Sequence, residues 1–124
     1  MNSRFVLPFV FLLIQAAPAA QADMVLSDQS KTHQYQFKEN HHLSISPAEK
    51  HSDAEAYAAV VAALKKVKKS YAKEIQGNPA SDFCVKLVEG KNLNLYDATE
   101  NEYAICKLKS GDLVDAWDLF RAKK

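Results

Sequence analysis

Apolar residues recur every three or four positions in the middle of the chain, which is the spacing of one face of an α-helix. The repeat runs through Tyr57, Val60, Val61, Leu64, Val67, Tyr71 and Ile75. Two S-x-x-E sequences, Ser46–Glu49 and Ser52–Glu55, are capping boxes that favour a helix start, and Pro47 suits a first helical position. Gly77 favours a helix end. We therefore expect a long amphipathic helix over residues 47–76.

The pattern after this helix predicts a short helix and then a β-hairpin. Asn78 is a good N-cap, and Pro79 follows it at the first helical position. We therefore expect a helix to begin there, with Phe83, Cys84 and Leu87 on its buried face. Alternating apolar residues then occur in two runs, Leu93 with Leu95 and Tyr103 with Ile105, on either side of a turn-like segment at 97–101.

A turn at Ser110-Gly111-Asp112 leads to the last predicted element. Leu113, Trp117 and Phe120 share one helical face, which predicts a C-terminal helix with Trp117 in the core. By contrast, residues 23–46 are polar, and the alternation of His33, Tyr35 and Phe37 predicts one strand at most. The expected fold class is α+β: a long amphipathic helix, a short helix, a β-hairpin and a C-terminal helix.

The first 22 residues have the features of an export signal. Arg4 is followed by an apolar run from Phe5 to Ile14, and Ala20-Gln21-Ala22 is an A-x-A cleavage site. The run is shorter than the roughly 20 residues that span a bilayer. We expect cleavage after residue 22 and a periplasmic or secreted protein, with a polar segment at 23–46, a helix at 47–76 and a C-terminal domain at 77–124.

Charge argues against nucleic-acid binding. The chain has 16 Lys and Arg residues and 15 Asp and Glu residues, and loss of residues 1–22 removes Arg4 and no acid, which leaves 15 of each. A nucleic-acid-binding domain usually carries a basic surface. About a hundred residues hold one small core, to which a disulfide is a useful addition.

Cys84 and Cys106 most simply pair with each other in an exported chain. The closed loop of 22 positions corresponds to roughly 3 kcal/mol of stabilisation in the chain-entropy model. A redox-active pair and an intermolecular bridge are the alternatives, but a catalytic pair usually has a C-x-x-C arrangement.

Two other groups of residues suggest alternative functions. His33, His41, His42 and His51 lie within nineteen positions and could bind zinc or copper, although adjacent histidines on a strand point to opposite faces. The second group is basic and crowds the end of the predicted helix, where it could contact an anionic membrane, but solvated lysines near a helix C-terminus are ordinary. Its members are Lys65, Lys66, Lys68, Lys69 and Lys73.

The C-terminal residues resemble a family of small bacterial exported proteins, domain-of-unknown-function family number 333, which often carries a haemolysin label. The resemblance covers about residues 77–121 and is carried by Asn78-Pro79-Ala80-Ser81, Phe83, Cys84, Cys106-Lys107-Leu108, Gly111, Trp117 and Arg121. The chain departs from the family pattern at Glu89-Gly90, where the pattern has two glycines, at Lys109-Ser110, where it has a proline, and at Ala116, where it has Glu.

The resemblance implies an envelope setting and supplies no established catalytic residue. Each shared residue has a sufficient structural role: Asn78, Pro79, Ala80 and Ser81 start a helix, Gly111 turns the chain and Trp117 fills the core. Arg121 is expected to pair with Asp82, Asp115 or Asp118, or to cap the last carbonyls of its helix. Ser81 has no histidine in its own part of the chain to activate it. We therefore expect a non-enzymatic exported binding module without a cofactor, whose partner is a protein or an envelope component.

Overall fold

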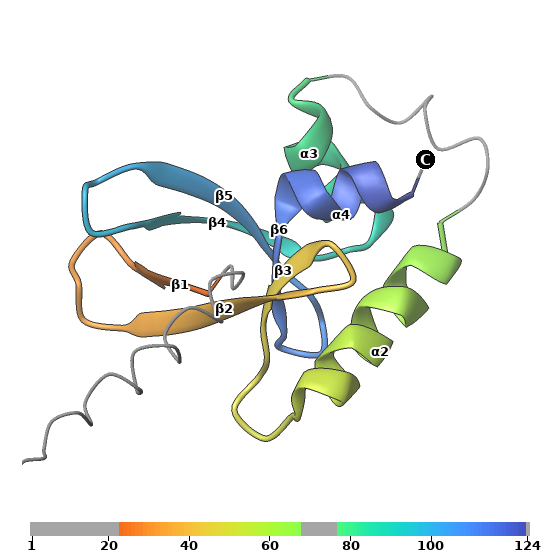
Figure 1. The fold of residues 1–124 in the computed structure, drawn as a ribbon. Helices are drawn as coiled ribbons and strands as arrows, with labels where there is room; N and C mark the ends of the chain where they lie inside the picture. Colours follow the sequence, from red (N-terminus) through yellow and green to blue (C-terminus); the bar gives the residue numbers. More distant parts are fainter. Residues whose placement is uncertain (1–22, 68–76, 124) are drawn as a thin grey trace, which may run out of the picture.

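A barrel of six antiparallel strands forms the body of the structure, a computed structural model that describes residues 23–67 and 77–123 (Figure 1). The strands are β1 (Met24–Ser27), β2 (Gln34–Asn40), β3 (Leu43–Ser46), β4 (Lys91–Tyr96), β5 (Glu102–Lys107) and β6 (Leu113–Asp115). Their order around the barrel is β1-β2-β3-β6-β5-β4. The predicted export signal and the predicted helix residues 68–76 lie outside the described residues.

The segment at 23–46 contributes three of the six strands, where the sequence pattern predicted one at most. β1 and β3 have four residues each, which is too short for a period of two to stand out. Their partners include distant parts of the chain: β3 pairs with β6, and β1 meets β4 at the single pair Ser27 and Tyr96, which closes the ring. The first half of the barrel therefore depends on tertiary pairing.

The interior of the barrel is filled by alternate residues of its strands. Leu26, Phe37, Leu95, Ile105 and Leu113 are all buried and form one hydrophobic cluster. Because side chains alternate across a strand, their neighbours in sequence point outward to solvent or to the helices.

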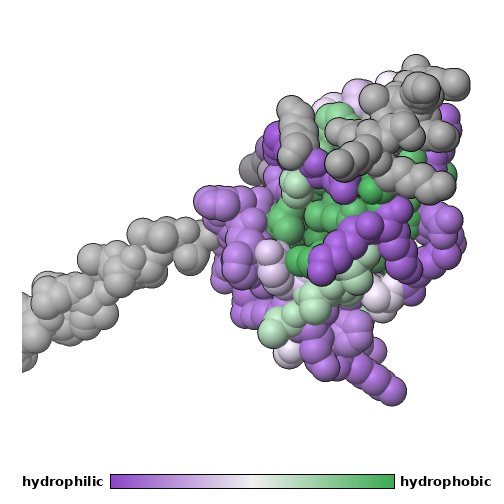
Figure 2. Space-filling view, turned by 90° about the vertical axis from the view of Figure 1, so that its right-hand side faces the viewer, coloured by the Kyte–Doolittle hydropathy of each residue, from purple (hydrophilic) through white to green (hydrophobic). Residues whose placement is uncertain are grey.

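Four helical segments pack on the outside of the barrel at the end where β3 and β6 lie (Figure 1). They are α2 (Asp53–Lys65), α3 (Pro79–Asp82), η4 (Phe83–Leu87, a π-helical turn) and α4 (Ala116–Ala122). A second cluster, which includes Val60, Phe83, Val114 and Leu119, fills the space between helices and strands. On the face that lies at the right-hand side of Figure 1, hydrophobic residues are visible at the surface between hydrophilic ones (Figure 2). No helix in the described parts of the chain is both long and apolar enough to cross a bilayer.

The described helix α2 is shorter than the predicted helix at 47–76 and starts six residues later. The second capping box is the one that forms, with the Glu55 amide donating to Ser52 Oγ at 3.1 Å and the Ser52 amide donating to Glu55 Oε1 at 2.8 Å. In the first box, Ser46 belongs to β3 instead. Within α2 only Ala56 and Val60 are buried, and Tyr57, Val61 and Leu64 of the predicted apolar stripe are half-buried.

The C-terminal region also differs from the prediction. β4 and β5 do pair in antiparallel register, but as two strands of the barrel and not as a separate hairpin. Leu113 belongs to β6 and points into the barrel, so it does not share a helical face with Trp117. The helix begins only at Ala116, because Asp115 caps it by accepting hydrogen bonds from the amides of Trp117 and Asp118.

The predicted disulfide between Cys84 and Cys106 is present and connects η4 to β5. Both cysteines are fully buried. The chain passes so close to the sulfurs at Gly90 that a Cβ atom there would lie 2.7 Å from Cys106 Sγ and 2.7 Å from the Lys107 carbonyl oxygen. Glycine is therefore required at position 90 for steric reasons, and the disulfide ties the helical end of the molecule to the barrel.

Candidate functional site

The short helix α4 presents two of the motif residues, Trp117 and Arg121, on its outer side. Ala116 and Leu119 face inward and are fully buried. Trp117 and Arg121 are four residues apart and therefore lie on the same side of the helix, one turn from each other.

Trp117 is 37% exposed, so its predicted place in the core is wrong. Its indole lies edge-to-face on Phe120, with ring centroids 6.1 Å apart and an interplanar angle of 84°. Phe120 in turn packs edge-to-face on the buried Phe83 at 5.7 Å. The indole is thus an exposed ring that a chain of aromatic contacts fixes to the core.

Arg121 is held by Asp118, with Nη2 donating to Oδ1 at 2.8 Å. The other carboxylate oxygen of Asp118 accepts from the backbone amide of Ser44 at 3.0 Å, which attaches α4 to β3. Because Asp118 uses one guanidinium nitrogen, most of the five N–H donors of Arg121 face away from this ion pair. The side chain of Arg121 is 59% exposed.

A hollow of about 330 Å³ adjoins Arg121 and separates α4 from the turn between β2 and β3. It is lined by His41, His42, Leu43, Asp118, Arg121 and Ala122. The His41 ring is stacked on Tyr57 at 4.1 Å, and its Nδ1 lies 2.7 Å from Asn40 Oδ1. We call Trp117, Arg121 and this hollow the α4 surface. It combines an aromatic ring, a guanidinium group and a concave wall with a fixed imidazole.

The four candidate metal-binding histidines do not come together. His33 lies beside Asp28, His42 beside Glu39 and His51 beside Asp112, while His41 stacks on Tyr57. Within residues 23–67 and 77–123, no three His, Cys, Asp or Glu side chains form a group that could hold a metal ion. Only His41 and His42 share a location, at the hollow of the α4 surface.

Asp112 is a buried carboxylate that the sequence analysis did not identify as important. It is fully buried and accepts hydrogen bonds from the Ala48 amide at 2.7 Å, from His51 Nδ1 at 2.9 Å and from Ser110 Oγ at 2.6 Å. Burial alone would raise the pKa of Asp112, but the bonds from Ser110, Ala48 and His51 together lower it below the ordinary value of 3.8. Asp112 thus fixes the loop between β3 and α2. Two of its partners, Ala48 and His51, lie more than 60 positions away, so no local signal could have shown them.

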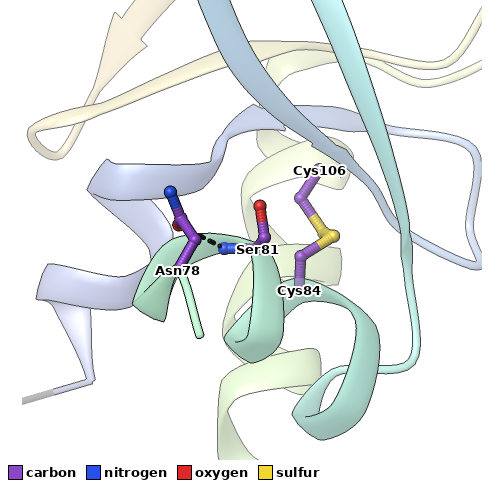
Figure 3. Close-up of a disulfide and its surroundings, with 4 residues drawn as sticks. All are labelled: Asn78, Ser81, Cys84 and Cys106. Atoms are coloured by element: carbon purple, nitrogen blue, oxygen red, sulfur yellow. Dashed lines mark hydrogen bonds between the residues drawn. A yellow bond between two sulfur atoms is a disulfide. The ribbon is translucent and has the colours of Figure 1, made fainter. Parts of the chain in front are cut away.

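The other motif residues have structural roles. Asn78 caps α3, its Oδ1 accepting from the Ser81 amide at 3.0 Å next to the disulfide, and Pro79 follows at the first helical position (Figure 3). Ala80 is buried, and Gly111 turns the chain at a φ of 93° before β6. These motif residues therefore build a scaffold, whereas Trp117 and Arg121 expose a large part of their side chains on α4.

Comparison with known proteins supports the resemblance in part. Residues 76–123 match the model of a family described as Domain of unknown function (DUF333), which covers α3, η4, β4, β5, β6 and α4. No curated protein and no solved structure matches the chain. β1, β2, β3 and α2 lie outside the matched region.

Proposed function

We propose that this protein is a non-enzymatic, exported binding module that docks a partner protein or an envelope component on its α4 surface. The observation that carries the proposal is the exposure of Trp117, the single tryptophan of the chain, at a position held rigid by Phe120. An exposed aromatic ring loses water contacts at little ordering cost when a partner covers it.

The neighbouring Arg121 supports the same proposal. Tryptophan and arginine are the residue types most enriched among the side chains that dominate binding energy, each worth about 2 kcal/mol or more when buried in an interface. Asp118 holds the guanidinium of Arg121 in place, so its remaining donors are oriented before a partner arrives. The hollow beside Arg121 offers a concave surface for a side chain of the partner.

The non-enzymatic part of the proposal is supported by the roles of the polar residues. The Asn78 side chain caps α3 by accepting from the Ser81 amide, and Asp112 binds the loop that contains Ala48 and His51. These groups are committed to holding the fold together. The disulfide between Cys84 and Cys106 is compatible with export to an oxidising compartment, the periplasm or the exterior.

Neither alternative function gains support from a specific contact. A metal-binding role would need the histidines to converge, and three of them instead lie beside separate acids. A membrane-active role would use the lysines at 65–73, most of which lie outside the described residues. The exposed, fixed indole is suited to docking on a partner surface, and we do not propose a haemolytic activity.

The proposal is tested by cross-linking in the producing cell. A photoreactive amino acid placed at position 117 should yield a discrete cross-linked product, whereas the same group at position 25 should not. Val25 is a suitable control because it is also an exposed apolar residue, at 51%, but on β1. The product should weaken by about thirtyfold when Arg121→Gln is added, as expected for loss of a side chain worth about 2 kcal/mol. Equal products from both positions, or none from position 117, would contradict the proposal.

A further inference from the structure

The strand β2 has an open edge that no described strand covers. β1 pairs with Gln34–Phe37 on one side of β2, and β3 pairs with Lys38–Asn40 on the other. The β3 side of Gln34–Phe37 therefore lacks a partner, and within the described residues no further backbone hydrogen bond reaches this stretch. Alternate residues of a strand direct their N–H and C=O groups to the same side, so this edge presents main-chain donors and acceptors.

A cavity of about 570 Å³ lies along this open edge. One wall consists of Gln34, Tyr35, Gln36 and Lys38 of β2, and the other walls include Leu93 of β4, Lys107 of β5 and Leu113 of β6. The volume falls in the range of about 300–1,000 Å³ that is typical of ligand sites. The edge therefore faces a space large enough to hold a short segment of another chain.

The gap is held open by fixed contacts. Pro47 follows β3 directly and has no N–H group with which to extend the ladder toward β2. The next amide, that of Ala48, donates to the buried Asp112 at 2.7 Å, and the His51 ring binds the same carboxylate. The chain after β3 is thus anchored to the turn before β6 and cannot pair with Gln34–Phe37.

The chemistry of the walls indicates what could fill the gap. Tyr35, Leu93 and Leu113 supply apolar surface. The charged residues of the lining are Lys107, Glu49, and Lys38 with Asp53, which pair at 3.8 Å. Lys107 stands directly opposite Lys91 in the pairing of β4 and β5, and among the described residues neither lysine forms an ion pair. Like charges placed opposite each other on neighbouring strands are unfavourable, so an incoming acidic side chain would be stabilised there.

We propose that the open edge of β2 at Gln34–Phe37 is a second binding site, which takes an extended peptide segment of a partner protein as an added β-strand, with one acidic side chain of that segment beside Lys107. The open stretch of four residues is about 13 Å long at roughly 3.3 Å per residue. Main-chain hydrogen bonds to β2 would supply affinity, and the apolar wall and Lys107 would supply selectivity. The site goes beyond the proposed function, since it shares no residue with the α4 surface.

The test uses a displayed library of random heptapeptides, panned against the full chain purified from the periplasm. We expect enriched peptides that contain an acidic residue beside an apolar one. On binding, they should slow amide hydrogen exchange within Gln34–Phe37. N-methylation of alternate peptide amides should weaken binding by about tenfold or more, since it removes strand hydrogen bonds.

Two charge reversals make a matched pair for this test. Lys107→Glu should weaken binding of the enriched peptides by about tenfold, while Lys65→Glu, on α2 and away from the cavity, should change it less than about twofold. Lys107→Glu replaces a like-charged cross-strand pair by an opposite one, and Lys65 is an exposed residue of α2, so neither substitution should unfold the protein. Trp117→Ala should leave peptide binding intact, which separates this site from the α4 surface. Failure to enrich any peptide, protection of α4 amides instead, or equal effects of the two reversals would overturn the proposal.

Discussion

Trp117 is the residue at which exposure and anchoring are combined. Its ring is fixed by Phe120 but remains 37% exposed, so only part of its surface is removed from water on folding. A fully buried tryptophan replaced by alanine typically costs about 3–5 kcal/mol, whereas an edge-to-face aromatic pair is worth about 0.5–1.5 kcal/mol beyond burial. Trp117 should therefore contribute less to stability than its size suggests.

We predict that Trp117→Ala lowers the free energy of unfolding by about 1–2 kcal/mol, measured by urea denaturation. Leu119→Ala is the matched control on the same helix, because Leu119 is fully buried. It should cost about 2–5 kcal/mol. If Trp117→Ala is as costly as Leu119→Ala, the indole is part of the core and the binding proposal loses its basis.

Asp112 is a buried residue whose charge state is coupled to the fold. Its pKa is lower in the folded protein than its ordinary value of 3.8, so the folded state binds fewer protons than the unfolded state in this range. The stabilisation is complete above about pH 4 and is lost as the pH falls through the lowered pKa. Asp97, whose pKa the Asn101 amide and other bonds lower to about 2, acts in the same direction.

We predict that Asp112→Asn reduces the difference between the free energies of unfolding at pH 7 and at pH 3. The control Asp23→Asn removes an exposed carboxylate without hydrogen-bonded partners in the described chain and should leave this difference unchanged. Thermal or urea denaturation at both pH values provides the measurement. An identical pH dependence in Asp112→Asn and wild type would show that Asp112 is not the coupled group.

At the scale of elements, the two-residue turn between β2 and β3 is unusual in composition. His41 and His42 have φ values of 54° and 66°, as in a type I′ hairpin turn, where Asn and Gly are favoured. A residue with a Cβ in this region costs roughly 1–2 kcal/mol. Stacking of the His41 ring on Tyr57 offsets part of this conformational cost. The His42 side chain is 97% exposed, and its Nδ1 lies 3.5 Å from Glu39 Oε2.

We predict that His42→Gly raises the midpoint of urea denaturation, because glycine removes the backbone strain of the positive φ. The greater entropy of glycine in the unfolded chain opposes this effect, so the free energy of unfolding should rise by about 0.5–1 kcal/mol. Glu39→Gly, at a position in the same hairpin without positive φ, should instead destabilise the protein. A loss of stability in His42→Gly would mean that its imidazole makes a contact stronger than the backbone strain.

At the scale of the whole molecule, the disulfide lies inside the cluster between the helices and the strands and ties η4 to the barrel strand β5. Cys84 lies in η4 among the helices, and Cys106 lies in β5, which also contributes Ile105 to the barrel interior. Closure of a loop of 22 residues corresponds to roughly 3 kcal/mol, a large share of the about 5–15 kcal/mol net stability of a domain.

We predict that replacing both cysteines, Cys84→Ala with Cys106→Ala, lowers the free energy of unfolding by about 3 kcal/mol. Protein taken from the periplasm should have a mass two hydrogens below that of the reduced chain. Two free thiols in that protein would contradict both the disulfide and the proposed export.

The sequence alone revealed the features that depend on neighbouring residues. The Ser52 capping box and the Asn78 cap each join groups three residues apart, so a short motif is sufficient to predict them. The cysteine pair could be predicted as well, because the chain contains two cysteines and a single intramolecular pairing.

Tertiary structure alone decided the barrel, the exposure of Trp117 and the buried Asp112. β1 and β3 are too short to show a period, and their pairing with β4 and β6 joins residues more than 60 positions apart. Leu113 lies in β6, and α4 begins only after the N-cap Asp115, so Leu113 and Trp117 do not share the predicted helical face. Trp117 therefore lies on the outer side of α4. Such outcomes depend on which distant groups meet, and the pattern of one segment does not contain that information.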